Sequence, residues 1–163
     1  MYQYSFANVD LTLEIDYPGN VNPKNFKVEG FTAGENLITA ARRAPICTTQ
    51  VVAYGDMVVS MQRIRAGDLT FPVLMNAPEN KILQDYANYF QEQADADGAL
   101  IYPIQGKLTD NMGKDEAVLS NGVILAMPAM SRGQTMNTIT WVLTFERVVF
   151  KRYNGDDAAN FGV

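Results

Sequence analysis

The side chains that most often carry catalysis are missing or isolated in this sequence. It contains no histidine, which removes Ser–His and Cys–His nucleophile pairs and most zinc and iron sites. Acidic residues are frequent, but no two lie in an apolar setting that would set their proton affinities apart, as catalysis by paired carboxylates requires. The sequence therefore predicts that the protein is not an enzyme.

One stretch has part of the pattern of a calcium-binding loop. Residues 93–98 read QADADG, with acids at the third and fifth loop positions and glycine at the sixth. The first position would be Gln93 and the twelfth Ile104, so neither the first ligand nor the bidentate one is present. A helix C-terminal cap explains the same residues, and the other glycines never reach the spacing of a phosphate-binding loop. We therefore expect no metal and no cofactor.

Length and composition are those of one domain without disulfides. The 163 residues fit a single domain, residues 1–163. The only cysteine, Cys47, has no partner for an internal bridge, which points to a reducing compartment. The N-terminus alternates in polarity and has no basic leader. The longest apolar stretch, residues 123–130, contains Pro128 and is shorter than the roughly 20 residues of a spanning helix. We expect neither a signal peptide nor a membrane anchor.

The charge balance argues against tight binding of nucleic acid. The chain has 18 acidic and 13 basic residues, a formal charge of −5, which repels a phosphate backbone. The basic pairs are separated by acidic stretches and are interpreted as solvated or interface charges; they are Arg42–Arg43, Arg63/Arg65 and Lys151–Arg152.

The clearest element is a helix between Asn76 and Gly98, covering about residues 77–95. Asn76 can cap its first N–H groups, Pro78 lies in the first turn, and Glu79 stands three residues after the cap. Apolar residues at three- and four-residue spacing predict one buried stripe: Ile82, Leu83, Tyr86, Ala87, Phe90 and Ala94. Gly98 is expected to end the helix, which should lie across a sheet and close its core.

The residues before this helix read as strands. Residues 9–16 alternate with a period of two, and residues 26–31 are expected to pair back on them. A second hairpin is predicted at residues 46–64, turning at Gly55–Asp56. The segment 32–45 carries both helix and strand signals, and we interpret it as extended. A turn at 65–68 precedes a strand in which Pro72 cannot donate to a ladder, so its nitrogen should face no partner and the strand should lie near an edge or a bulge.

After the helix the pattern is again that of strands. Residues 99–105 form a strand interrupted by Pro103, residues 106–116 read as a polar loop, and Asn121–Gly122 is a strong hairpin signal. The last strand, residues 138–150, changes its apolar parity at Glu146–Arg147, which indicates a bulge or a change of packing partner. The tail, residues 154–163, is expected to be mobile. The predicted fold class is mainly β (α+β), a β-sandwich or half-barrel of antiparallel strands with one packing helix.

Several stretches, in this order along the chain, resemble the tail tube proteins of contractile-tailed bacteriophages. They are YSFANVDLTL, GFTAGENLI, the turn Tyr54–Gly55–Asp56, DLTFPVLMNAPENKILQDYANYF and NTITWVLTFERV. The resemblance implies that six subunits form a ring, that rings stack into the inner tube of the tail, and that the tube conducts the genome without binding it. It also implies tail sheath, baseplate and tail terminator proteins as partners, a location in the virion tail, and assembly in the host cytoplasm.

Two other functions remain open from the sequence. One is the related tube of a bacteriocin or a type VI-like secretion particle, whose subunit is similar. The other is a monomeric β-barrel that binds a small ligand in its mouth, where Trp141 would line the pocket.

The tube hypothesis comes with candidate contact residues. The aromatic N-terminus, Tyr2, Tyr4 and Phe6, has few obvious internal partners and is expected at subunit contacts. Residues 32–55 are expected to form an extended loop to the neighbouring ring, with Arg42 and Arg43 meeting its carboxylates. The acids expected to face the channel are Asp10, Glu14, Asp16 and Asp110.

Overall fold

The computed structural model describes residues 9–31, 38–94, 100–110, 115–135 and 137–152. The expected contacts at Tyr2, Tyr4 and Phe6, the helix stop at Gly98 and the tail at 154–163 lie outside these ranges. Within the described residues, no helix has the length and apolar character that crossing a membrane takes.

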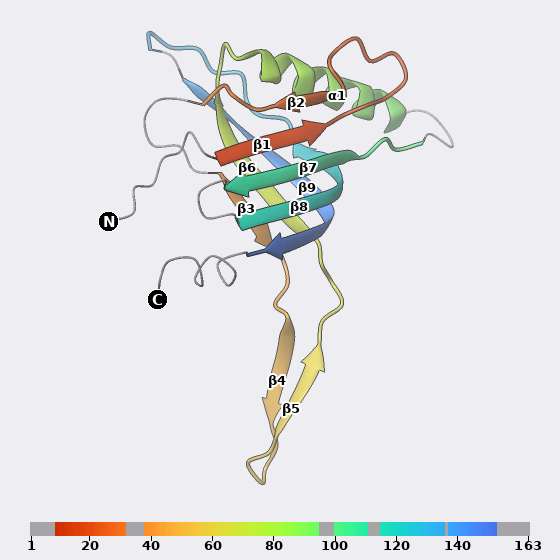
Figure 1. The fold of residues 1–163 in the computed structure, drawn as a ribbon, viewed down its shortest axis with the longest axis vertical. Helices are drawn as coiled ribbons and strands as arrows, with labels where there is room; N and C mark the ends of the chain where they lie inside the picture. The colour runs from red at the N-terminus through yellow and green to blue at the C-terminus, as the bar shows by residue number, and fades with distance from the viewer. Residues whose placement is uncertain (1–8, 32–37, 95–99, 111–114, 136, 153–163) are drawn as a thin grey trace, which may run out of the picture.

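The core of the fold is one open, antiparallel sheet of seven strands in the order β2-β1-β7-β8-β9-β6-β3 (Figure 1). The mainly β fold with one helix is confirmed. Strands along the chain before the helix are β1 (Val9–Glu14), β2 (Asn25–Lys27), β3 (Thr39–Arg42), β4 (Cys47–Val51), β5 (Met57–Met61) and β6 (Gly67–Leu74). After α1 (Pro78–Ala94) come β7 (Ile104–Asp110), β8 (Asp115–Ala126) and β9 (Thr138–Lys151).

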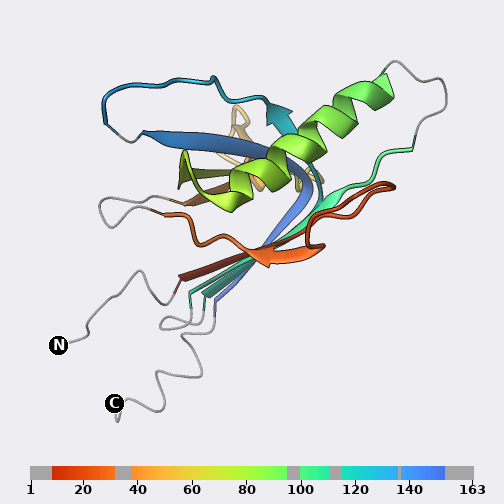
Figure 2. The ribbon, with the colours of Figure 1, turned by 90° about the horizontal axis from the view of Figure 1, so that it is seen from above.

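The sheet curves, and α1 lies across its hollow face (Figure 2). Inward residues of the strands meet the helix in one core that contains Leu11, Phe71, Trp141 and Phe145, all at most 1% exposed. Trp141 donates its indole N–H to Asn80 Oδ1 on the helix at 2.9 Å. Trp141 is therefore part of the core between sheet and helix, not the lining of an open barrel mouth.

The helix agrees with the predicted range, and its buried stripe is shorter than predicted. Ile82, Leu83, Tyr86 and Ala87 are buried, whereas Phe90 is only half-buried and Ala94 is exposed. Pro78 is the first helical residue, so Ala77 rather than the predicted Asn76 is the cap residue, and Glu79 follows this cap by two positions instead of three. Its carboxylate is buried instead and accepts the backbone N–H of Glu29 at 3.1 Å.

The strands before the helix follow the alternation in the sequence. Leu11, Leu13 and Ile15 point inward, and β2 pairs back on β1, with Leu13 opposite Phe26. Within the ambiguous segment 32–45, Thr39–Arg42 is extended and pairs with β6. The predicted turn at 65–68 is wrong, because β6 already starts at Gly67. A Cβ at Gly67 would lie 2.5 Å from Ala41 O, so this glycine allows close strand packing rather than a turn.

The expectation for Pro72 is confirmed. β6 is next to the edge strand β3, which pairs only with residues 67–70. Two residues after Pro72, the Leu74 N–H donates to Gly30 O at 2.7 Å, away from β9. Since alternate residues of a strand direct their N–H groups to the same side, the nitrogen of Pro72 faces the side where β3 has already ended.

Asn121–Gly122 is not a hairpin turn, because β8 runs through it without a break. Ile104 pairs with Gly122 and Gly106 with Leu119, so Gln105 alone faces two residues of β8 in a β-bulge. Asn121 takes the left-handed conformation there, with φ 56°. The buried positions shift at this bulge from Ala117 and Leu119 to Gly122 and Ile124. The dipeptide that favours a tight turn can equally supply the bulge.

The other strands after the helix also differ from the sequence pattern. No strand is assigned at residues 100–103; β7 starts after Pro103, at Ile104, and continues to Asp110, where a loop was predicted. At Gly106, in this central strand, a Cβ would lie 3.0 Å from Leu13 Cδ2, so the position has little room for a side chain. The parity change in β9 is confirmed by the buried Val148, but Phe150 remains 44% exposed. β9 pairs with β6 only up to Phe145, which agrees with a change of partner.

Candidate assembly interface

The hairpin of β4 and β5 is a separate two-stranded sheet that projects from the body of the molecule along its long axis (Figure 1). The predicted pairing of these strands is confirmed, with Cys47 opposite Met61 and Val51 opposite Met57. At the tip, Gly55 N–H donates to Val52 O and Gly55 adopts φ 89°, so the turn is Ala53–Tyr54–Gly55 rather than Gly55–Asp56. Tyr54 is 96% exposed at this tip.

One face of this hairpin is apolar and open to solvent. Directly opposed residues of an antiparallel pair share a face, so the register gives one face with Cys47, Thr49, Val51, Met57, Val59 and Met61. We call these six residues the apolar face of the hairpin. Its large side chains, at Val51, Met57, Val59 and Met61, are between 46% and 71% exposed. The opposite face carries Thr48, Gln50, Val58 and Ser60.

An ordered hairpin of this kind needs a surface to pack on. A two-stranded ribbon alone is marginally stable in water, and contiguous exposed apolar surface on a soluble protein marks an interaction site. In the main sheet the same alternation is closed by α1, but the side chains on the hairpin's apolar face stay open in the single chain. The apolar face is therefore the candidate functional surface of the molecule.

The base of the hairpin is fixed to β9 from two sides. The Val148 N–H donates to Arg65 O at 2.8 Å, and the Val148 carbonyl accepts Arg42 Nε at 2.9 Å. The two chains that lead into and out of the hairpin thus hold the same residue of the main sheet. These bonds position the hairpin although none of its own strands joins the seven-stranded sheet.

Arg43 also bonds inside the subunit. Its guanidinium lies 2.8 Å from Asp68 Oδ1 and donates to Thr144 Oγ1 at 2.8 Å. Thr144 in turn donates to Asp68 Oδ1 at 2.7 Å. The hydrogen bond from Arg43 lowers the pKa of Asp68, against the opposing effect of burial. Both predicted contact arginines, Arg42 and Arg43, therefore have partners at the hairpin base, whereas no described residue of the core covers the apolar face.

The structure brings three of the four predicted channel acids to one face. Asp10 and Glu14 point outward from β1, away from α1, and Asp16 follows them. This face is not uniformly acidic. Lys27 Nζ lies 2.7 Å from Asp10, Lys24 Nζ lies 3.3 Å from Asp16, and on the neighbouring strands Lys107 pairs with Glu116 at 2.8 Å.

Asp110 does not share that face. It pairs in register with Val9, so its side chain lies on the side of Leu11 and Leu108 rather than that of Asp10. It also faces Asp115 across β7 and β8, and Asp115 Oδ1 is buried without a hydrogen-bond partner in the part of the chain described. Over the described ranges, no three His, Cys, Asp or Glu side chains are grouped so that they could hold a metal ion.

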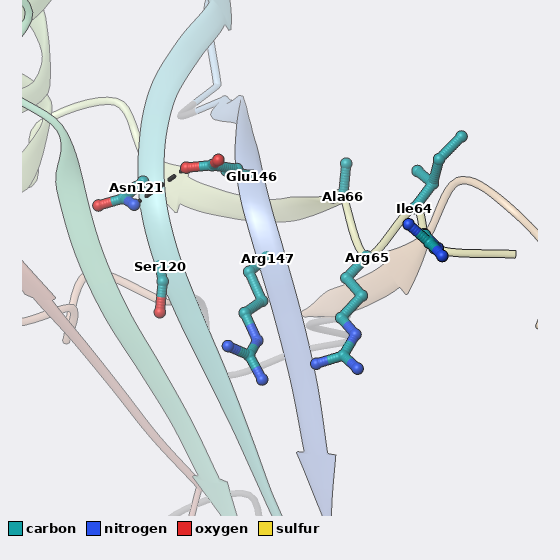
Figure 3. Close-up of a pocket in the computed structure, with 8 residues that line it drawn as sticks. Ile64, Arg65, Ala66, Ser120, Asn121, Glu146 and Arg147 are labelled. Atoms are coloured by element: carbon teal, nitrogen blue, oxygen red, sulfur yellow. Dashed lines mark hydrogen bonds between the residues drawn. The ribbon is translucent and has the colours of Figure 1, made fainter.

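Next to the hairpin base lies an open hollow of about 540 Å³ (Figure 3). Its lining is rich in arginine, with Arg63, Arg65 and Arg147, and it also includes Ser120, Asn121 and Glu146. Asn121 Nδ2 donates to Glu146 Oε2 at 3.0 Å, a bond that holds this acid at the rim. Figure 3 shows the side chains of Arg65 and Arg147 pointing the same way from neighbouring segments.

The apolar face could not be recognised from sequence periodicity. The alternation in β4 and β5 resembles that of β1 and β6, whose apolar residues are buried under the helix. The signal that could have separated them is the number of amphipathic elements compared with the number of elements available to cover them. A single helix of 17 residues can cover one sheet, so a further amphipathic hairpin is left without a cover.

Comparisons with known proteins find structures with a similar fold, and they find no match to a family model or to a curated protein. Among solved structures, a chain from the PVC sheath/tube terminator of an extracellular contractile injection system, in the extended state, is similar with a TM-score of 0.53 and 12% identity, covering 93% of this chain and 98% of that one.

Two further structures give the same result. A chain from the tube terminating cap of the anti-feeding prophage has a TM-score of 0.52 at 11% identity, covering 94% of this chain and 93% of its own. A chain from the PVC sheath–tube complex in the extended state has a TM-score of 0.55 at 8% identity, covering 93% of both chains. The chain therefore has a fold that also occurs in contractile injection systems.

Proposed function

We propose that the protein is a structural, non-enzymatic subunit of a contractile particle, which assembles with copies of itself into rings that stack as a tube. The observation that carries the proposal is the open apolar face of the hairpin, on a fold similar to chains from tube terminator, cap and sheath–tube structures. The contact moves from the predicted segment 32–55 to both arms of the hairpin, residues 47–61.

The finer features of this proposal follow the resemblance of the sequence to phage tail tubes. The rings are hexameric, they enclose a channel for the genome, and the tail sheath, baseplate and terminator proteins surround and close them. The tube belongs to the tail of a virion assembled in the host cytoplasm. The net charge of −5 supports a channel that DNA passes without sticking. Asp10 and Glu14 would face that channel together with Lys27, which pairs with Asp10, and Lys107, which pairs with Glu116, so the wall carries charges of both signs.

A second candidate is a subunit of the ring that ends a tube. It is favoured by two of the similar structures, which are a sheath/tube terminator and a tube terminating cap. Both candidates use the hairpin to dock on another ring. They differ in growth, because a tube subunit adds rings without limit, whereas a terminating ring stops after one.

The test compares two neighbouring valines of β5. Val59 lies on the apolar face and Val58 on the opposite one, with similar exposures of 46% and 52%. Both are open in the subunit, so Val59→Asp and Val58→Asp should each change the free energy of unfolding by about 0.5 kcal/mol or less. If copies dock on the apolar face, only Val59→Asp places a charge in an interface core, and assembly should weaken by about 100-fold or more, since every 1.4 kcal/mol is tenfold in affinity.

Light scattering after size-exclusion chromatography, together with negative-stain micrographs, gives the readout. We expect rings or tubes from the wild type and from Val58→Asp, and subunits of 18.1 kDa from Val59→Asp. Open tubes would support the tube subunit, and single rings the terminating one. Hydrogen exchange should be fast over residues 47–61 in dilute subunits and slow in assemblies. A wild type that stays monomeric at high micromolar concentration would refute the proposal, as would equal assembly of the two variants.

A further inference from the structure

The arginine-lined hollow at the hairpin base has a surplus of positive charge that no carboxylate of the described residues pairs with. No ion pair joins Arg63, Arg65 or Arg147 to a carboxylate of the described ranges. By contrast, Arg43, in the segment that leads into the hairpin, is paired with Asp68. The one acid on the rim, Glu146, accepts its hydrogen bond from Asn121 rather than from an arginine. All three arginines are exposed, and two of them lie side by side in Figure 3.

Such an arrangement suits a carboxylate from another molecule. Arginine offers a planar fork of donors that matches a carboxylate, and like charges held close together repel one another until a counter-charge arrives. Ser120 and Asn121 add polar groups to the same wall. The chain as a whole carries −5, which disfavours a nucleic acid as the occupant and favours an acidic protein surface.

The opposite end of this chain presents exposed carboxylates. Figure 1 shows α1, β2 and the connection between β1 and β2 at one end of the long axis and the hairpin at the other. Asn22 of that connection donates to Asp85 of α1 at 2.9 Å, which joins the two segments. At the same end Lys81 lies 4.0 Å from Asp85 and Lys24 lies 3.3 Å from Asp16, whereas the exposed acids Glu29 and Glu92 form no ion pair within the described residues. It also leaves three apolar side chains strongly exposed: Val21, Leu100 and Ile101.

The two ends are therefore complementary within the described residues: the hairpin end has arginines without an ion pair and exposed apolar side chains, and the helix end has carboxylates without an ion pair and exposed apolar side chains. We infer that the hollow of Arg63, Arg65 and Arg147 receives carboxylates from the helix end of a second copy of this chain, beside the docked apolar face of the hairpin. A contact between unlike ends repeats without closing, so it extends along an axis. The inference rests on the proposed assembly and adds its polarity, because the charges make every copy point the same way.

The experiment reverses charge in the hollow and at a matched distant place. Arg65→Glu with Arg147→Glu should raise the concentration needed for assembly at least tenfold at 50 mM NaCl and remove most of its salt dependence. The neutral pair Arg65→Gln with Arg147→Gln should act in the same direction and less strongly. The control, Lys107→Glu with Lys151→Glu, makes the same change in net charge on the face of the main sheet away from α1, outside the hollow and the helix end, and should not weaken assembly. Trp141 fluorescence verifies that each variant is folded.

A rescue experiment tests the partner surface. Glu29→Arg with Glu92→Arg should weaken assembly alone and should co-assemble with the Arg65→Glu, Arg147→Glu variant. Wild type that assembles while both hollow variants assemble equally well at every salt concentration would overturn the inference and leave the proposed function standing. A wild type that never assembles would overturn both. Salt-dependent binding of a duplex DNA oligonucleotide that the hollow variants abolish would assign the hollow to phosphate instead.

Discussion

Replacing Gly122 by alanine should destabilise the subunit through a single clash. A Cβ placed on Gly122 would lie 2.4 Å from Cδ1 and Cε1 of Phe145 and 2.9 Å from its Cζ. These distances are about 1 Å shorter than an ordinary carbon contact. Phe145 is 0% exposed and lies opposite Gly122 in the β8–β9 register, so its ring has nowhere to move without shifting the core.

The size of the effect follows from that confinement. Overpacking a dense core by one methyl group costs about 1–3 kcal/mol. We expect the upper half of this range, about 2–3 kcal/mol, because three ring atoms are involved and the ring is fully buried. For a chain of 163 residues this corresponds to a fall in Tm of about 4–12 °C. Urea denaturation followed by the single tryptophan, Trp141, measures it, since this residue is 1% exposed in the same core.

Two further variants separate the clash from other causes. Gly133→Ala has no atom nearer than 3.7 Å to the new methyl group and should change the free energy of unfolding by about 0.5 kcal/mol or less. Phe145→Leu in the Gly122→Ala background should recover part of the loss, so the pair should be less than additive. A Gly122→Ala protein as stable as Gly133→Ala would refute the reasoning. It would mean that Asn121–Gly122 is an exposed turn and that β8 does not run through it.

Three other predictions concern the helix and two titrating groups. Tyr86→Asp should cost several kcal/mol in thermal melts and Gln91→Asp little, because Tyr86 is 1% exposed and Gln91 lies on the outer face; equal effects would mean the buried face is misassigned. Burial raises the pKa of Tyr86 to about 12, so the folded state favours the neutral phenol. The wild type should therefore lose stability between about pH 10 and 12, and Tyr86→Phe should reduce this loss in urea titrations. Because Arg43 lowers the pKa of Asp68, the folded state favours the carboxylate. The stabilisation that results is complete above pH 3.8 and is lost as the pH falls through the lower pKa of the folded state. Asp68→Asn should therefore make the free energy of unfolding depend less on pH in this acidic range.

Alternation in polarity predicted most of the fold, and glycine accounts for most of the errors. The buried sides of β1, β6 and β9 and the length of α1 follow from residue spacing alone. The errors at 65–68, 106–116 and 121–122 each contain a glycine interpreted as part of a turn or a loop. In the structure, the place of the missing Cβ is taken by Ala41 O at Gly67, by Leu13 at Gly106 and by Phe145 at Gly122.

The glycines that do form turns differ in a way the sequence does not show. Gly19 and Gly55 adopt φ 83° and 89°, and at each of them no atom lies within 4 Å of the position that a Cβ would take. Glycine thus serves two separate purposes, a left-handed backbone or a close approach of neighbours. Which one applies depends on residues distant in the sequence, such as Phe145 opposite Gly122. Local pattern contains no information about that neighbour.

The candidate interface was harder to predict for a related reason. A strand whose alternate side chains are apolar must be covered, but its sequence is the same whether the cover is a helix of its own chain or a second molecule. Arg42 and Arg43 looked like contacts because they are charged, and both have partners at the hairpin base. Within the described residues, the side chains that the core leaves uncovered are ordinary apolar ones, such as Val59 and Met61, on a hairpin too far from α1 to share its core. In an assembling protein the missing layer of the fold belongs to the neighbour, so exposure in the single subunit, rather than residue type, locates the contact.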